Sequence, residues 1–190
     1  MDGSRRLSQA IAEGDGISVL VEVADAVGAQ AAQDQGAEGL VVRGPAGTIR
    51  ESCELPVLGY GRADELGGID AVVVDGSAPG DSLEVVIAAV HHGGLECVLR
   101  VSDEDDLEEL LDLVDPEIFL LTAEDAEDGQ SLLERLLELL ADVPAGKLAI
   151  AELAGASRED VVELERAGVD AVIVSSSDIG SLVGDTLPDH

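Results

Sequence analysis

The sequence predicts an α/β protein, a minimal (β/α)8 TIM barrel. Eight short apolar runs of strand length alternate with stretches of helical periodicity. The runs are continuously apolar, as expected for parallel strands that are buried on both faces. A weak repeat precedes the even-numbered strands: GAEGLVV (36–42), GIDAVVV (68–74), GVDAVIV (168–174) and, more loosely, VDPEIFLL (114–121). The alternative is an open parallel α/β sheet, but eight short strands with so little connecting chain favour closure.

The stretch 149–177 shows the βαβ pattern best. A short apolar strand ends in Glu152, and Ser157 with Asp160 has the spacing of a capping box. A helix follows and ends at Gly168, because glycine takes a left-handed conformation without steric cost. Ala171–Val174 is then a buried strand. A βαβ unit of this kind makes a parallel sheet the expected arrangement.

The other elements follow along the chain. Strands are expected at 17–23, 40–42, 56–58, 71–74, 96–101 and 118–121, and helices at 7–13, 25–35, 81–92, 102–114, 130–141 and 177–184. Ser102 is the expected N-cap of the helix at 102–114. The helices after the second and third strands are shortened to about one turn each, at 48–53 and 62–66. We expect them to leave outer barrel surface uncovered, which a second copy or a protein partner would cover.

Length and composition predict one domain over 1–190, with a short N-terminal helix in 1–16 and a frayed tail at 185–190. The net charge of −31 repels nucleic acid and anionic membrane surfaces, and one Phe, one Tyr and no Trp leave little for base stacking. Lys147 is the single lysine. An acidic, lysine-poor surface suits concentrated salt, so a halophilic source is one hypothesis and a GC-rich genome is another.

The sequence predicts a cytoplasmic protein without a signal peptide, a membrane span, a metal site or a cofactor. Cys53 and Cys97 match no metal motif. The acids at 103–106, with Glu108 and Glu109, lie in the first turns of a helix, where they complement its dipole.

The stretch AELAGASREDVVELERAGVDAVIVSSS resembles the seventh and eighth βα units of indole-3-glycerol phosphate synthase, a (β/α)8 enzyme of tryptophan biosynthesis. SVLVEVAD (18–25), LPVLGYG (55–61) and VLRVSDEDDLEELL (98–111) look like its first, third and fifth units. The resemblance implies a carboxylate and phosphate ligand at the C-terminal ends of the strands, and loss of carbon dioxide with ring closure. Glu22 and Glu152 match two of the family's glutamates.

Other family positions carry different residues here. The resemblance places the family's catalytic or binding lysines, glutamate, asparagine, serine and phosphate-binding glycine at Ala24, Tyr60, Arg100, Leu121, Leu153 and Ser175. Without those lysines the chain is not expected to run the family mechanism.

Four candidate site residues are Glu22, Tyr60, Arg100 and Glu152, near the C-terminal ends of the odd strands. In the functional interpretation they form a small-ligand site in which Arg100 binds an anion. In the structural interpretation they form a closed network in which Arg100 pairs with Glu22 or Glu152, because buried charges need partners.

Ser175, Ser176 and Ser177 follow the last strand, where barrels often bind phosphate. The alternative is that they cap the short helix at 178–184. Arg43 and Asp75 end two even strands and either pair across the barrel or face solvent.

The predicted function is a pseudoenzyme: a barrel that has lost synthase activity and acts as a non-catalytic small-anion-binding or interaction module. The alternative is an enzyme, either a degenerate synthase or another lyase or isomerase acting on a phosphorylated sugar.

Overall fold

The computed structural model describes residues 5–76, 82–123, 130–175 and 179–182. The helices are α1 Arg6–Glu13, α2 Ala26–Asp34, α3 Gly47–Ser52, α4 Ala63–Leu66, α5 Leu83–His92, α6 Glu104–Leu113, α7 Leu132–Ala141 and α8 Arg158–Ala167, with a 3₁₀ turn, η1, at Ile179–Ser181. The strands are β1 Ser18–Glu22, β2 Gly39–Val42, β3 Val57–Tyr60, β4 Ala71–Asp75, β5 Glu96–Val101, β6 Ile118–Leu121, β7 Leu148–Glu152 and β8 Ala171–Val174.

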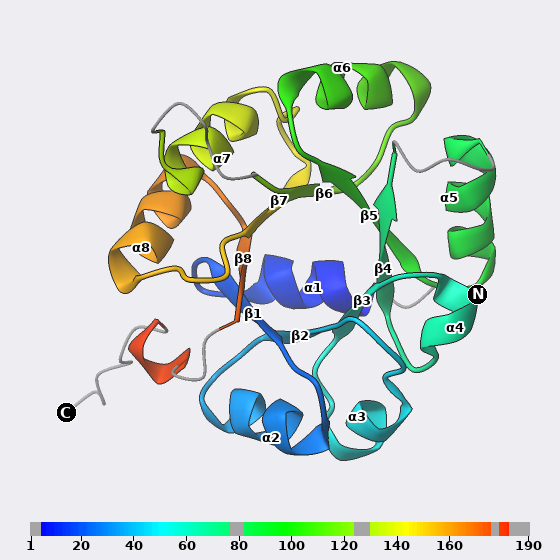
Figure 1. The fold of residues 1–190 in the computed structure, drawn as a ribbon, viewed down its shortest axis with the longest axis vertical. Coiled ribbons are helices and arrows are strands. Elements are labelled where there is room, and N and C mark those ends of the chain that lie inside the picture. The colour runs from blue at the N-terminus through cyan, green and yellow to red at the C-terminus, as the bar shows by residue number, and fades with distance from the viewer. Residues whose placement is uncertain (1–4, 77–81, 124–129, 176–178, 183–190) are drawn as a thin grey trace.

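The eight strands form a closed barrel in chain order, and every neighbouring pair is parallel. The closing pair joins β1 to β8, with Ser18 opposite Ala171 and Val21 opposite Val174. Figure 1 looks along the barrel, with the outer helices arranged around the strands. The predicted (β/α)8 barrel is therefore confirmed, and the open sheet is excluded.

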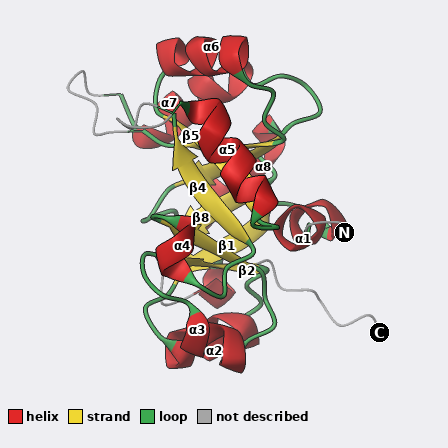
Figure 2. Cartoon of the chain, turned by 90° about the vertical axis from the view of Figure 1, so that its right-hand side faces the viewer, coloured by secondary structure: helices red, strands yellow, loops and turns green. Residues whose placement is uncertain are grey.

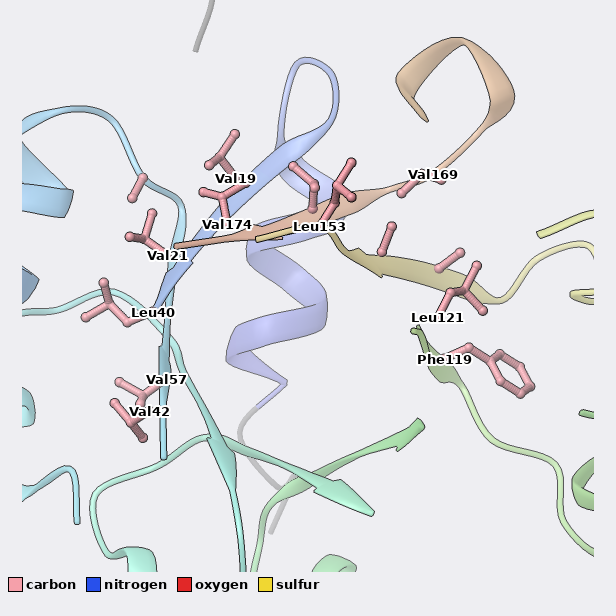
Figure 3. Close-up of a cluster of buried hydrophobic side chains, with 14 of the residues drawn as sticks. Val19, Val21, Leu40, Val42, Val57, Phe119, Leu121, Leu153, Val169 and Val174 are labelled. Atoms are coloured by element: carbon pink, nitrogen blue, oxygen red, sulfur yellow. The ribbon is translucent and has the colours of Figure 1, made fainter. Parts of the chain in front are cut away.

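Side chains alternate between the inside of the barrel and its outer wall. Inward residues such as Leu20, Leu58 and Ile150 form one buried cluster inside the strands. Outward residues form a second, larger cluster beneath the helices. Figure 3 shows Val19 and Val21 on one strand as members of this outer cluster. Because the aromatic content is only 1%, both clusters consist almost wholly of aliphatic side chains.

Helix α1 closes the N-terminal end of the barrel, and Figure 1 shows it across the middle of the strand ring. Its Leu7 and Ile11 are buried in the inner cluster. The N–H of Leu7 donates to the carboxylate of Glu96, the first residue of β5, at 2.7 Å. Arg6 binds the carboxylate of Asp70 and the carbonyl of Glu54. A carboxylate at a helix N-terminus also complements the helix dipole.

The acidic residue of the sequence repeat has a structural role. The carboxylate of Asp70 accepts a hydrogen bond from the N–H of Val57 at 2.9 Å, and that of Asp170 accepts one from the N–H of Ala149 at 2.8 Å. In both cases the acid, just before an even strand, binds the neighbouring odd strand. In these two copies of the repeat, the acid therefore satisfies a backbone donor near the start of the odd strand.

The two shortened helices are confirmed, but the uncovered surface beneath them is not. Gly59 has no side chain, and a Cβ there would lie 2.7 Å from Cδ1 of Leu66. Helix α4 therefore packs directly onto the barrel wall, and the outward residues Val57 and Val72 are buried by the chain itself. The expectation of an uncovered wall was wrong, because the glycine permits a short helix to cover it; a partner on this side stays a prediction.

Most predicted helix ends are confirmed. Ser157 and Asp160 form a capping box, and Gly168 has a left-handed conformation with φ of 101°. The predicted N-cap at Ser102 was wrong: Asp103 accepts the hydrogen bond of the Asp106 N–H at 2.8 Å, and the helix begins one residue later. The Ser102 hydroxyl donates instead to the Asp106 carboxylate.

Candidate functional site

The C-terminal ends of the strands form the barrel mouth, where the four candidate side chains gather. Glu22, Tyr60 and Glu152 are the last residues of β1, β3 and β7, and Arg100 is the second-last residue of β5. Each lies two positions beyond a residue of the inner cluster, respectively Leu20, Leu58, Ile150 and Val98. The strand alternation therefore directs all four toward the barrel axis.

Arg43, directly after β2, is the cation at the centre of this group. Its Nε donates to Glu22 Oε1 at 3.0 Å and its Nη2 donates to Glu22 Oε2 at 3.3 Å. The same Nη2 donates to Glu152 Oε1 at 2.9 Å. The hydrogen bond to Glu22 raises the pKa of Arg43 further, so the guanidinium stays charged. One arginine thus joins the ends of β1, β2 and β7.

Tyr60 completes the Arg43 cluster, which consists of Arg43, Glu22, Tyr60 and Glu152. Its hydroxyl donates to Glu152 Oε2 at 3.0 Å, and the Arg43 guanidinium lies 4.2 Å from the centre of its ring. That geometry is a cation–π contact. Burial, followed by the charge of Glu152, raises the pKa of Tyr60, so its hydroxyl stays protonated and donates.

Arg100 does not pair with Glu22 or Glu152, so that part of the closed-network prediction was wrong. Its Nη1 donates to Asp75 Oδ2 at 3.3 Å, and its Nε donates to Thr122 Oγ1 at 3.3 Å. The reason is distance around the barrel: Asp75 and Thr122 come from β4 and the end of β6, the two strands beside β5. The mouth therefore holds two arginine centres. The charge of Arg100 also acts on Tyr60, where it offsets a small part of the rise in the Tyr60 pKa.

A cleft opens beside the Arg43 cluster. It has a volume of about 420 Å³ and is lined by Glu22, Ala24, Arg43, Ile49 and Ser175, among others. Ser175, which the sequence predicts to bind phosphate, is exposed there, directly after β8. Ser176 and Ser177 lie outside the described residues, as do 178, 183 and 184 of the helix predicted at 178–184. Its described part, 179–182, contains the 3₁₀ turn η1. The cleft thus brings together a guanidinium, a hydroxyl and apolar walls.

Sequence reasoning placed Arg43 and Asp75 at the ends of two even strands, but it expected them to pair across the barrel or face solvent. Arg43 binds Glu22 and Glu152 instead, and Asp75 binds Arg100. Sequence reasoning missed Thr122, the other partner of Arg100. Arg43, Asp75 and Thr122 each stand two positions beyond an inward residue of an even strand, respectively Val41, Val73 and Leu120. The same alternation, continued past the end of β6, would have found Thr122. It also shows that Leu121 and Leu153 belong to the outer cluster, so Thr122 is the β6 residue at the mouth.

The acidic turn at the start of α6 has a capping role. Asp103 caps the helix, and Glu104, Asp105 and Asp106 occupy its first turn. Across the described ranges, no group of three or more His, Cys, Asp or Glu residues is arranged to hold a metal ion.

No helix in the part of the chain that the structure describes has both the length and the apolar character needed to cross a bilayer.

Comparisons with known proteins agree with the fold and with the resemblance. No model of a known protein family matches the chain. The chain is 30% identical to indole-3-glycerol phosphate synthase from Geobacillus sp. (strain WCH70) over 58% of its own length and 43% of that protein. It is also 30% identical to the synthase from Variovorax paradoxus (strain S110), over 67% of its own length and 51% of that protein. The chain thus spans about half the length of the curated relatives it matches.

Solved structures show the same barrel. The N-acetylmannosamine-6-phosphate 2-epimerase from Clostridium perfringens matches with a TM-score of 0.68 at 17% identity, covering 84% of this chain and 86% of that one. Thiamine phosphate pyrophosphorylase from Pyrococcus furiosus matches with a TM-score of 0.64 at 17% identity, covering 87% and 90%. These likenesses concern the fold. By sequence, the chain is a divergent (β/α)8 barrel similar to indole-3-glycerol phosphate synthases.

Proposed function

We propose that this chain is a small-anion-binding barrel without indole-3-glycerol phosphate synthase activity. The observation that carries the proposal is the position of Arg43, whose guanidinium is held by Glu22 and Glu152 at the edge of the cleft that Ser175 also lines. A phosphate or carboxylate is the ligand class that a guanidinium and a hydroxyl recognise together.

The cations available support the proposed absence of synthase activity. The single lysine, Lys147, pairs with Asp115 and precedes β7, at the opposite end of the barrel from the mouth. The resemblance places the family's lysines at Ala24 and Tyr60, where this chain has no amine. The mouth therefore lacks the ammonium groups that hold substrate and donate protons in the family.

The charges named at the mouth predict weak binding. Glu22, Asp75 and Glu152 face Arg43 and Arg100, so the carboxylates outnumber the guanidinium groups. Arg43 uses Nε and Nη2 for its bonds to the two glutamates. Among the described residues no partner of Nη1 is seen, so Nη1 can donate to a ligand. We expect a dissociation constant for phosphate on the order of 1 mM, because the overall negative charge opposes anion binding.

The binding test uses inorganic phosphate and the fluorescence of Tyr60, the only tyrosine in a chain without tryptophan. Arg43→Gln should weaken binding about tenfold, because a hydrogen bond to a charged group contributes about 1.5 kcal/mol or more. Arg62→Gln, at an exposed arginine that pairs with Asp64 on α4, is the matched control and should leave binding unchanged. Equal affinity in wild type and Arg43→Gln would refute the site.

The activity test follows formation of indole-3-glycerol phosphate from the family's anthranilate-derived ribulose phosphate. We expect no product above the uncatalysed rate. Turnover that disappears in Glu152→Gln would overturn the non-catalytic part of the proposal.

A second candidate function is a lyase or isomerase acting on a phosphorylated sugar. The observation that favours it is the hydrogen bond from Tyr60 to Glu152, which places a carboxylate base beside a proton donor and a cation. Such a base would remove a proton from the carbon next to a carbonyl and return it. Incubating the protein with ketose phosphates in deuterated water, with Glu152→Gln as the control, would reveal the exchange; no enzyme-dependent deuterium uptake would exclude it.

A further inference from the structure

The acid of the sequence repeat has a different environment in its first copy. In each of the three close copies, the backbone N–H of the acid donates to a carbonyl of the neighbouring odd strand; the pairs are Glu38–Val19, Asp70–Val57 and Asp170–Ala149. In the second and third copies, the carboxylate also accepts the N–H of that same partner residue. The Glu38 side chain is one methylene longer, and among the described residues its carboxylate has no hydrogen bond and no ion pair.

The Glu38 carboxylate lies at the turn between α1 and β1. A Cβ at Gly14 would lie 3.0 Å from Ser18 Oγ, 3.2 Å from Glu38 Oε1 and 3.5 Å from the carbonyl oxygen of Ile11. Oxygen atoms from α1, from β1 and from the residue before β2 therefore surround one point on the open side of a glycine. We call these three oxygens the Gly14 oxygen site. Figure 2 shows α1 at one end of the strands, and the site lies where this helix ends.

Ser18 is the residue whose hydroxyl needs a further partner. It is fully buried, and within the described ranges its Oγ has no hydrogen-bond partner. Burying a hydroxyl without a partner is costly, so such groups are rare in folded proteins. Its Oγ is the nearest of the three oxygens to the Gly14 position. The hydroxyl thus faces the same point as the Glu38 carboxylate, and this indicates that another group binds there.

The charge at this point favours a cation. The C-terminal end of a helix carries partial negative charge, and its last carbonyls, here including that of Ile11, lack partners within the helix. Helix α1 has no basic residue in its last turn, and Gly14 is extended, with φ of −63° and ψ of 147°, so the usual left-handed cap is absent. A carboxylate beside such a helix end is unfavourable unless a positive charge lies between them.

We propose that the Gly14 oxygen site binds a small monovalent cation, Na⁺ or K⁺, which joins α1 to the starts of β1 and β2. Carboxylate, carbonyl and hydroxyl oxygens are the ligands of hard cations. The single carboxylate suits a single positive charge, and the described part of the chain holds no group of three acids, histidines or cysteines that would suit a metal of higher charge. The site lies at the opposite end of the barrel from Arg43 and is independent of the proposed anion binding.

The first test compares the Tm in the chlorides of Na⁺, K⁺ and tetramethylammonium at equal ionic strength. All three salts screen the net charge of −31 equally, so a difference between them reports binding that depends on the size of the cation. Na⁺ or K⁺, at about 100 times its dissociation constant, should raise the Tm by about 5 °C or more above the value in tetramethylammonium. The same Tm in all three salts would overturn the proposal.

The second test locates the cation. Glu38→Gln removes the charge, and Gly14→Ala fills the site at a φ that alanine adopts freely, so each should abolish the difference between the salts. Glu109→Gln, an equal change of charge at an exposed position on α6, is the matched control and should keep the difference. A difference that survives both Glu38→Gln and Gly14→Ala would show that the cation binds elsewhere.

Ser18→Ala distinguishes a cation from a bridging water. In tetramethylammonium chloride the variant should be as stable as the wild type or more so, because the hydroxyl it removes has no partner there. In the salt of the bound cation it should be less stable than the wild type, because a ligand is lost. A Tm that falls equally in all three salts would show that a water molecule occupies the site, and would refute the cation.

Discussion

The two ends of the barrel use the same kinds of group in opposite arrangements. At the N-terminal end, one carboxylate, Asp70, is 4% exposed and accepts bonds from Arg6 at 3.2 Å, Arg50 at 2.7 Å and the N–H of Val57 at 2.9 Å. At the mouth, one arginine, Arg43, is 49% exposed and donates to two carboxylates. A buried ion with several partners is costly to disturb, whereas an exposed ion can exchange its partners. The first arrangement therefore suits a structural role, and the second suits the anion site that we propose.

Removing the central carboxylate of the N-terminal end should have the largest effect. Asp70→Ala should lower the free energy of unfolding by about 3 kcal/mol, because it leaves two arginines and a backbone N–H without their shared acceptor. Urea denaturation measures the change. Burial raises the pKa of Asp70, and the Val57 N–H and the Arg6 charge offset part of that rise. If the free energy of unfolding falls by less than about 1 kcal/mol, the ion pairs of Asp70 contribute no more than exposed ion pairs do, and the two ends of the barrel do not differ in this respect.

The ionisation of Tyr60 provides an intermediate test of how enclosed the mouth is. Ultraviolet absorbance of tyrosinate reports this residue alone, because the chain has one tyrosine. Burial and Glu152 raise its pKa, so the folded protein should keep the phenol protonated above the ordinary value of about 10. Glu152→Gln should lower the Tyr60 pKa in part, since burial remains.

The raised pKa of Tyr60 also makes the free energy of unfolding depend on pH in the alkaline range. The unfolded chain loses the Tyr60 proton first, so the stability contribution is complete below about pH 10 and falls as the pH rises above it. Titration at the ordinary pKa in the folded protein would mean that solvent reaches the ring freely, contrary to the packing of Arg43 on it.

The smallest effect on stability should come from removing a carboxylate at the mouth. Glu22→Gln should change the free energy of unfolding by no more than about 0.5 kcal/mol, because the Arg43 pair is largely exposed. It should also strengthen phosphate binding severalfold, since Arg43 then keeps only Glu152 as a charged partner. Asp75→Asn provides the matched substitution at the Arg100 centre. Phosphate affinity that rises only in Asp75→Asn would move the anion site to Arg100.

The barrel could be predicted from local signals, because each one recurs along the chain. Continuous apolar runs located the strands, and the glycine and acid before the even strands marked the turns. The acid proved to bind the adjacent strand, as Asp70 and Asp170 show. The coverage of the wall beside the short helices was mispredicted, since it depends on the close contact of Leu66 with Gly59, a distance that no local pattern contains.

At the mouth, the alternation of side chains fixed which residues face inward, and Glu22, Tyr60, Arg100 and Glu152 all lie there. Their pairing could not be predicted in the same way. It depends on the stagger of the strands and on the reach of arginine, which lets Arg43 bind residues from β1 and β7 together. The helix cap at Asp103 in place of Ser102 shows the same limit on a smaller scale, since either side chain can cap a helix.

The closing pair of strands has a consequence for how the chain is made. Within the barrel, α1 and β1 are synthesised before the other elements. The hydrogen-bond partner of Leu7, Glu96, follows 89 positions later, and β1 gains its second neighbour only when β8 has been synthesised. Until then, one edge of β1 has no paired strand, and such an edge can pair with strands of other nascent chains. A chain truncated before Ala171 should therefore aggregate during translation and not yield a smaller stable barrel.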